Sequence, residues 1–372
     1  MRLRNAAVVL LVLWGCVAVS AQGPARLPAD KRERVETAIS SFMSRQNVPS
    51  LSIAIVKDNE ICFSGAYGFT DLENFVPAKT VTVYRIASTT KPLTATAVMQ
   101  LAEKGKLDLD APIQKYVPSF PIKKFPVTTR ELLAHLSGIR YYRQGEGERT
   151  LRYNTLTDAL SIFKDDALEN EPGTTFLYTT YGYTLLGAVI EGASGMSFMD
   201  YMKEHVFKPA GMLRTTNDDV FAVIRNRARG YTPRVFGQLD GNYRNPVLMD
   251  SSYKIPGGGI VSTAEDLARF AIAVQNGTLI KRETFAEMTR SQKTRDGRET
   301  GYGYGWYVGG TLGFPIGDPE AVWHGGVQPG FTSDLVILPS QRFAVVILTN
   351  LEAGDRLGLD SLVKQLSDIM RQ

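Results

Sequence analysis

The chain has 372 residues, of which 44% are hydrophobic and 22% are charged. This composition is typical of a globular protein with a large core. Because single cores stop growing at about 250–300 residues, we expect two lobes. Lys and Arg total 42 against 38 acidic residues, a formal charge of +4. This near-neutral balance gives no reason to propose a nucleic-acid partner.

The first 21 residues have the pattern of a secretory signal peptide. Arg2 and Arg4 form a basic start, and the apolar run from Ala6 to Val19 is short for a bilayer span. Small residues at Val19 and Ala21 predict cleavage before Gln22. We therefore expect an exported protein, periplasmic or secreted, whose mature domain is residues 22–372. Without the two arginines, 40 basic residues face 38 acidic ones, a formal +2.

Two alternatives for this segment stay open. It could be retained as a membrane anchor, or Cys16 could be lipidated, since Leu13-Trp14-Gly15-Cys16 loosely matches a lipoprotein signal. Contact with a membrane is expected only in these two cases. Cleavage leaves Cys62 as the single cysteine, so no internal disulfide can form. The β-like setting of Cys62 predicts a buried, inert thiol.

The predicted elements fall into three stretches. The first holds a helix over residues 30–46 and a hairpin of strands 51–57 and 61–67. The second is helical, with helices predicted over 88–104, 129–136, 157–168, 183–191 and 198–207. The third has a helix over 263–274 capped by Thr263, strand-like runs at 303–309, 321–327, 332–338 and 342–349, and a terminal helix over 357–370.

Strands at both ends and helices in the middle predict one antiparallel sheet built from both termini. The expected fold class is α+β, an α/β sandwich in which helices flank the sheet and an all-helical lobe is inserted. The sheet lobe is expected at about residues 30–87 and 250–372, and the helical lobe at about 105–245. A functional site is expected where the two lobes meet.

The pattern Ser-x-x-Lys is the first chemical candidate. On a helix, positions i and i+3 share a face, so the amine can approach the hydroxyl. A lysine in a dry site can lose its charge and take the proton of the serine. The pattern occurs four times, as Ser88/Lys91, Ser161/Lys164, Ser251/Lys254 and Ser361/Lys364. Four copies show that the bare pattern decides nothing, so context must separate them.

Ser88 has the most favourable context. It follows the strand-like run 81–86 and opens an apolar helix with Pro92 in its first turn. The free N–H groups and positive dipole end of a helix start would stabilise an oxyanion. The alternative is that Ser88 only caps the helix.

A tyrosine cluster is the second candidate. Tyr178, Tyr181 and Tyr183 follow the turn Glu171-Pro172-Gly173. A tyrosine ionised by a nearby lysine can act as general base. The alternative is that all three are packing residues, and spacing does not choose among them.

The segment Trp323-His324-Gly325-Gly326-Val327 is the third candidate. Two glycines weaken a strand unless something must approach its backbone closely. A substrate lying along an edge strand is such a reason, and the N–H of Val327 could then complete an oxyanion hole with that of Ser88. The alternative is a satisfied His324 and a bulge at the glycines.

These three segments together resemble a known family. Ser88-Thr89-Thr90-Lys91, Tyr178-Thr179-Thr180 and His324-Gly325-Gly326 resemble, in order, the Ser-x-x-Lys, Tyr-x-Asn and Lys-Thr-Gly or His-x-Gly motifs of the class C β-lactamase-like serine hydrolases. That group includes D-Ala-D-Ala carboxypeptidase-like enzymes, penicillin-binding proteins and esterases. Similar flanking phrases, such as Tyr84-Arg85-Ile86-Ala87 and Leu132–Ile139, extend the resemblance over nearly all of residues 30–370.

The resemblance implies a β-lactamase/transpeptidase-like fold and a reaction through an acyl-enzyme. Its implied catalytic residues are Ser88, Lys91 and Tyr178. Its implied substrate and oxyanion contacts are Thr180, His324, Gly325, Gly326 and Val327. No metal or organic cofactor is implied, and the three histidines form no HExxH pattern. An α/β-hydrolase is excluded because no Gly-x-Ser-x-Gly elbow is present.

Two departures from the motifs bear on the substrate. Thr180 stands where the family usually has asparagine, and a hydroxyl cannot supply the paired donor and acceptor of a carboxamide. The mitochondrial β-lactamase-like serine proteases are similar here, with Tyr-Ser-Thr. His324 in place of lysine removes a permanent positive charge. We therefore predict acyl transfer on a β-lactam, a D-amino-acid peptide or a small ester, the alternative being a catalytically weak penicillin-binding or scaffold protein.

Overall fold

The computed structural model describes residues 27–235, 238–309 and 318–372. The expected signal segment and Cys16 lie outside these residues. The α-helices are α1 (Ala29–Gln46), α2 (Thr90–Glu103), α3 (Thr129–Leu133), α4 (Leu156–Leu160), α5 (Thr180–Ser194), α6 (Phe198–Met202), α7 (Lys208–Ala210), α8 (Ile255–Gly258), α9 (Ala264–Gln275), α10 (Arg282–Met288) and α11 (Leu359–Arg371). Short 3-10 turns include η1 (Ala87–Thr89), η3 (Glu146–Glu148) and η5 (Ser252–Lys254).

The strands form one large sheet and two small ones. They are β1 (Ser50–Lys57), β2 (Glu60–Asp71), β3 (Val76–Pro77), β4 (Tyr84–Arg85), β5 (Thr216–Asn217), β6 (Thr232–Pro233), β7 (Tyr243–Arg244), β8 (Ile260–Ser262), β9 (Tyr307–Val308), β10 (Val322–Gln328), β11 (Phe331–Leu338) and β12 (Phe343–Thr349). The large sheet is antiparallel in the order β3-β2-β1-β12-β11-β10-β9, and β4-β8-β5 and β6-β7 form the small sheets. Because β1 pairs with β12, with Leu51 opposite Thr349, the predicted sheet built from both ends of the chain is confirmed.

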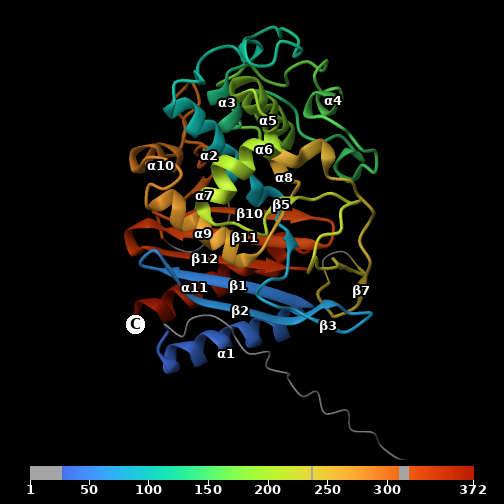
Figure 1. The fold of residues 1–372 in the computed structure, drawn as a ribbon, viewed down its shortest axis with the longest axis vertical. Helices are drawn as coiled ribbons and strands as arrows, with labels where there is room; N and C mark the ends of the chain where they lie inside the picture. The colour runs from blue at the N-terminus through green and yellow to red at the C-terminus, as the bar shows by residue number, and fades with distance from the viewer. Residues whose placement is uncertain (1–26, 236–237, 310–317) are drawn as a thin grey trace, which may run out of the picture.

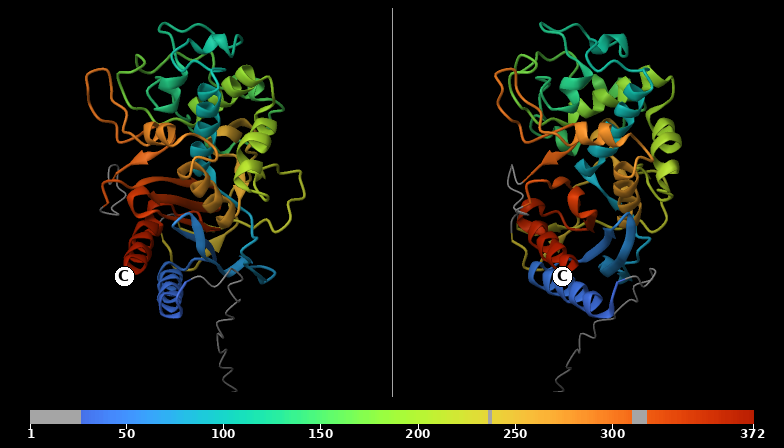
Figure 2. Two further views of the ribbon diagram at one scale, coloured as in Figure 1. Left: turned by 60° about the vertical axis from the view of Figure 1, so that its left-hand side comes forward. Right: turned by 90° about the vertical axis from the view of Figure 1, so that its left-hand side faces the viewer.

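Each face of the large sheet packs against its own helices. Alternate residues of a strand point to opposite faces. In β1, Leu51, Ile53 and Ile55 join the core under α1 and α11, whereas Ala54 and Val56 join the core on the other side. There α9 packs on β1 and β12. The two further views show α1 and α11 side by side beneath the sheet (Figure 2).

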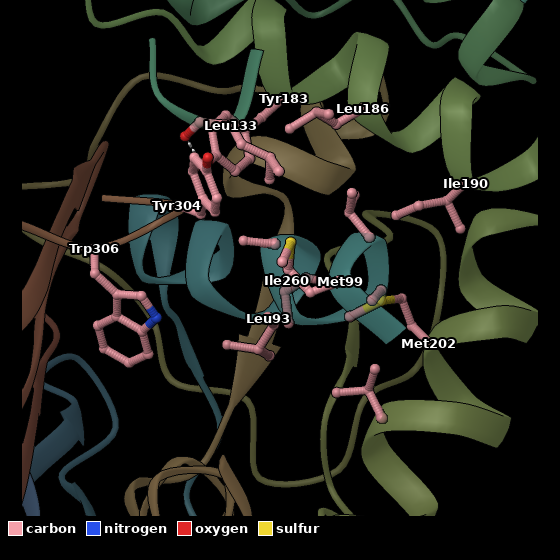
Figure 3. Close-up of a cluster of buried hydrophobic side chains, with 14 of the residues drawn as sticks. Leu93, Met99, Leu133, Tyr183, Leu186, Ile190, Met202, Ile260, Tyr304 and Trp306 are labelled. Atoms are coloured by element: carbon pink, nitrogen blue, oxygen red, sulfur yellow. Dashed lines mark hydrogen bonds between the residues drawn. The ribbon is translucent and has the colours of Figure 1, made fainter. Parts of the chain in front are cut away.

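Helix α2 is the central element of the helical region, which lies above the sheet in Figure 1. Its residues from Thr90 to Leu101 are all buried, as expected for a helix packed on every side. Figure 3 shows Leu93 and Met99 of α2 among side chains from α5 such as Ile190. This packing fixes the start of α2, where Ser88 lies.

Some predicted elements are shorter in the structure. The helix predicted over 157–168 is only α4, which starts at a capping box between Thr155 and Asp158. The strand predicted over 303–309 is only β9, because Gly305 has φ of +85° and so cannot be extended there. Within the described part of the chain, no helix has the length and apolar character to cross a membrane.

Candidate active site

Ser88 lies in η1, the turn that leads into α2, and its side chain is partly exposed. The N-cap of α2 is Thr89, which makes no side-chain capping bond, so the alternative that Ser88 only caps the helix is wrong. Ala87 just before it has φ of +45°, a left-handed conformation that is unfavourable for a residue with a side chain. The surrounding structure therefore holds the Ser88 turn in a strained shape.

Hydroxyl groups attach this turn to the large sheet. Thr89 Oγ1 donates to the carbonyl of His324 on β10 (3.1 Å) and lies 2.9 Å from Ser333 Oγ on β11. Ser333 Oγ in turn donates to the carbonyl of Ile86 (2.7 Å). These bonds join residues far apart in sequence and fix Ser88 beside β10.

Lys91 is the immediate neighbour of Ser88. Its Nζ lies 3.0 Å from Ser88 Oγ, 2.8 Å from the carbonyl oxygen of Gly257 and 3.5 Å from Thr180 Oγ1. Burial lowers the pKa of Lys91 well below its ordinary value, and the positive charge of Lys254 lowers it further. The structure therefore favours the uncharged amine, which can accept a proton from Ser88.

Tyr178 is the tyrosine that meets this pair. Lys91 Nζ lies 4.7 Å from the centre of its ring. Burial and then the neighbouring Tyr307 raise the pKa of Tyr178 well above 10, although a hydrogen bond with Ser88 acts in the opposite direction. Tyr178 is thus a neutral phenol in the resting site, contrary to the expectation of an ionised tyrosine.

The other two tyrosines of the cluster have partners elsewhere. Tyr181 donates its hydroxyl proton to Glu146 (2.9 Å), and Tyr183 donates to the carbonyl of Leu133 (3.0 Å), a bond drawn dashed in Figure 3. Both are buried packing residues. The ring of Tyr183 also lies near Lys91, 5.5 Å from its Nζ, but the Tyr183 hydroxyl is bonded to Leu133. Of the three tyrosines, Tyr178 is the one with a hydrogen bond to Ser88.

His135 holds the Tyr178 segment from both sides. Its carbonyl accepts from the N–H of Leu177 (2.8 Å), and its Nδ1 accepts from the N–H of Thr179 (3.2 Å). Its ring lies 4.4 Å from the ring of Tyr178. Sequence reasoning had noted His135 only within a family-like phrase and had assigned it no role.

His324 is buried and uncharged. Its Nδ1 lies 2.7 Å from the carbonyl oxygen of Gly325, which can only accept, so Nδ1 carries the proton. Its Nε2 therefore accepts from the hydroxyl of Tyr302 (3.1 Å). Burial, and then the neighbouring Lys91, lower the pKa of His324 to about 3. No sequence signal had pointed to Tyr302.

The edge of β10 faces the nucleophile turn. Among the described residues, β9 pairs with β10 at Val322 and Trp323 alone, so no described strand covers that edge from His324 onward. A two-residue turn joins Gln328 to Phe331, so alternate N–H groups of β10 bond to β11 and that of Val327 points to the free edge. The register is regular, so the alternative of a bulge at the glycines is wrong.

Gly326 allows β10 to approach this closely. A Cβ atom there would lie 2.4 Å from the carbonyl oxygen of Ile86 and 2.8 Å from the backbone nitrogen of Ser88. Only glycine fits such a contact. The N–H groups of Ser88 and Val327 therefore come from two backbone segments in direct contact, the arrangement required of an oxyanion hole.

The remaining Ser-x-x-Lys pairs do not form such sites. Ser161 donates to the carbonyl of Asp158 at the end of α4. Lys364 forms an exposed ion pair with Asp368 on α11, as its surface helix predicted. Ser251 donates its proton to the carboxylate of Asp218 instead of pairing with Lys254, which is buried. The thiol of Cys62, also singled out in the sequence, is partly buried with its pKa raised by burial to about 11.

The fold and the Ser88–Lys91 contact together are those of a serine hydrolase. The family described as Beta-lactamase matches residues 35–366 of the chain. The chain belongs to this beta-lactamase family.

Individual relatives agree with this assignment. The serine beta-lactamase-like protein LACTB, mitochondrial, of Homo sapiens is 35% identical over 298 residues, 62% of this chain and 54% of that protein. Protein flp of Staphylococcus aureus (strain MW2) is 28% identical over 338 residues, 88% of this chain and 65% of that protein. The chain thus spans about half to two thirds of the length of these curated relatives. The octameric penicillin-binding protein homologue from Pyrococcus abyssi superimposes with a TM-score of 0.75 and 28% identity, over 92% of this chain and 78% of its own.

Proposed function

We propose that this chain is an exported serine hydrolase that acts on an amide or ester through an acyl-enzyme on Ser88. The observation that carries the proposal is the 3.0 Å contact between Lys91 Nζ and Ser88 Oγ, in a buried setting that favours the uncharged amine. A serine hydroxyl becomes a strong nucleophile only when a base takes its proton.

The first step transfers the Ser88 proton to Lys91 while Oγ attacks the substrate carbonyl. The N–H groups of Ser88 and Val327 stabilise the oxyanion that forms. The proton then passes from Lys91, through the hydroxyl of Tyr178, to the departing nitrogen or oxygen. In this scheme Lys91 and Tyr178 share the proton transfer. Lys91 is the initial base, because Tyr178 is a neutral phenol.

The second step releases the acyl group. Water gives one proton to Lys91 as it attacks the ester carbonyl, and Ser88 Oγ recovers that proton as it leaves. Each step uses the oxyanion site once, so donors fixed by the backbone serve acylation and deacylation alike.

The site favours a substrate without a carboxylate close to the scissile bond. His324 is uncharged and its Nε2 is occupied by Tyr302, so it offers no positive charge to a carboxylate. Thr180 is buried and its hydroxyl lies near Lys91, so it cannot replace the carboxamide of asparagine. Among the candidate substrates, small esters and amides fit these groups better than a β-lactam.

A second candidate function is a catalytically weak penicillin-binding or scaffold protein. The buried Thr180 supports it, because a missing substrate contact lowers turnover. The Ser88–Lys91 contact opposes it, since a scaffold has no need of an uncharged lysine beside a serine.

A serine-directed fluorophosphonate tests the proposal. We expect wild-type protein to gain one adduct by intact mass, with none on Ser88→Ala at unchanged melting temperature. Labelling of both proteins would exclude Ser88 as the nucleophile. Benzylpenicillin and p-nitrophenyl butyrate then separate the classes: a lasting penicillin adduct indicates a penicillin-binding protein, penicillin turnover a lactamase, and ester cleavage alone an esterase.

The N-terminal proposal has its own measurement. We propose that residues 1–21 are removed on export and that a sheet lobe at about 30–87 and 250–372 and a helical lobe at about 105–245 make up the mature protein. An N-terminus at Gln22 in protein recovered outside the cytoplasm is expected. An N-terminus at Met1 would instead support a retained membrane anchor, and a lipid on Cys16 would support a lipoprotein.

A further inference from the structure

Lys254 is a second buried lysine near the site, which the proposed mechanism does not use. It ends η5, and only 6% of the residue is exposed. Its Nζ lies 3.3 Å from the sulfur of Met249 and 5.6 Å from the centre of the Tyr253 ring. Neither partner carries a charge, and no carboxylate of the described residues lies within 4.0 Å of this ammonium.

Asp218, the acid with the largest electrostatic effect on Lys254, is already paired with other groups. Asp218 is fully buried, and its Oδ2 lies 2.8 Å from Arg85 Nε and accepts from Ser251 Oγ (2.8 Å). Arg227 pairs with its other oxygen. Two arginines for one carboxylate leave no negative charge to balance Lys254, and Glu148 is an exposed residue of η3.

Lys254 and Lys91 belong to one local cluster. Gly257, whose carbonyl accepts from Lys91, lies three residues after Lys254 and directly continues its turn into α8. Two buried ammonium groups without a shared anion repel each other, so a proton on Lys254 disfavours a proton on Lys91. Burial lowers the pKa of Lys254 to about 8, whereas that of Lys91 is lowered by burial and by Lys254 itself.

We propose that Lys254 is a positioning residue for acylation, acting through Lys91: its buried positive charge keeps Lys91 in the uncharged form that accepts the Ser88 proton. The inference rests on the proposed function of Ser88 and Lys91. It also accounts for a buried lysine whose Nζ lies against a sulfur atom and a ring, without a carboxylate within 4.0 Å among the described residues. The titratable or charged groups that face Lys254 are Lys91, Arg85, Asp218, Glu148 and Tyr253.

The pH dependence of Ser88 labelling by a fluorophosphonate tests the proposal. Methionine matches the lysine stem in length and suits a neighbour such as Met249, so Lys254→Met removes the charge with little change in volume. Without the like charge, Lys91 retains its proton to higher pH. We expect the acid limb of the labelling profile to move to higher pH, with a rate roughly threefold to tenfold lower at pH 6.

The profiles of wild type and Lys254→Met are expected to converge above about pH 9, where Lys254 has already lost its proton. Lys364→Met is the matched control, because it removes the same charge from the exposed face of α11. Its profile is expected to follow that of wild type. Lys254→Arg, which keeps the charge, is expected to retain the acid limb of wild type.

Three results would overturn the inference. The first is an unshifted profile in Lys254→Met; the second is an equal fall at every pH, which indicates a structural role. The third is a shift of the same size in Lys364→Met. If the methionine variant fails to fold, Lys254→Gln provides the same comparison. None of the three overturning results affects the Ser88→Ala test. Failure of this inference is therefore distinguishable from failure of the proposed function.

Discussion

Replacing Gly326 by alanine tests whether contact between β10 and the nucleophile turn creates the site. The new methyl group would lie 2.4 Å from the carbonyl oxygen of Ile86, 2.7 Å from Ser333 Oγ and 2.8 Å from the nitrogen of Ser88. Two of these atoms are backbone, so the clash cannot be relieved by a side-chain rotation. Overpacking of this kind costs about 1–3 kcal/mol of folding stability.

The same displacement separates the two proposed oxyanion donors. Loss of one such donor lowers kcat by about 10²–10³-fold. We therefore expect Gly326→Ala to remain folded, with a lower melting temperature, and to lose about this much kcat on p-nitrophenyl butyrate. Circular dichroism melting and steady-state kinetics measure the two effects separately.

Gly325→Ala is the matched comparison. It adds the same methyl group one residue earlier, where it would meet the side-chain oxygen Oδ1 of Asp334 at 2.7 Å instead of backbone atoms of the Ser88 turn. A side-chain oxygen can move, so we expect a clearly smaller loss of kcat. Equal losses in the two variants, or full activity in Gly326→Ala, would refute the reasoning.

Two further predictions follow from the histidines. His135→Asn keeps an acceptor for the N–H of Thr179 and suits the φ of +57°, whereas His135→Leu does neither. We therefore expect Ser88 labelling to be roughly tenfold to hundredfold slower in the leucine variant than in the asparagine variant. Equal rates in the two variants would contradict a role of His135 in positioning Tyr178. The pKa of His324 is about 3 in the folded protein and about 6.5 in the unfolded chain, so the unfolded chain takes up a proton first as the pH falls. The free energy of unfolding therefore decreases as the pH drops from 6.5 towards 3, by up to about 1.4 kcal/mol per pH unit. Thermal melts from pH 7 to pH 4 should show a weaker pH dependence in His324→Gln, and identical slopes would exclude His324 as a source of this acid sensitivity.

Local sequence patterns were sufficient for the main elements of the sheet and for the Ser88–Lys91 pair. Alternation in β1 and β2 and the turn between them predicted the hairpin, because side chains of a strand alternate between two faces. Ser88 and Lys91 lie three positions apart at the start of α2, so their contact depends on local backbone geometry. Local context favoured this pair among the four, and the resemblance then agreed with that preference.

Long-range contacts could not be predicted in the same way. Tyr178, Tyr181 and Tyr183 are equivalent by spacing, and only the family resemblance singled out Tyr178. The structure adds that the rings of Tyr178 and Tyr183 both lie near Lys91 Nζ, whereas the hydroxyl of Tyr183 is bonded to Leu133. The burial of Lys254 likewise has no local signal, since its segment η5 packs against α4 and α5, which lie far away in sequence. The neutral state of Tyr178 follows from burial among other rings, which composition does not reveal.

The pairing of β1 with β12 has a consequence for how the chain is made. Leu51 and Thr349 are opposite each other, so the inner edge of the N-terminal hairpin has no partner until nearly the last part of the protein has been synthesised. A polypeptide that cannot close its central sheet early stays open for longer. The same delay leaves an unpaired strand edge available to other chains, so loss of β12 through early termination would yield an aggregation-prone product.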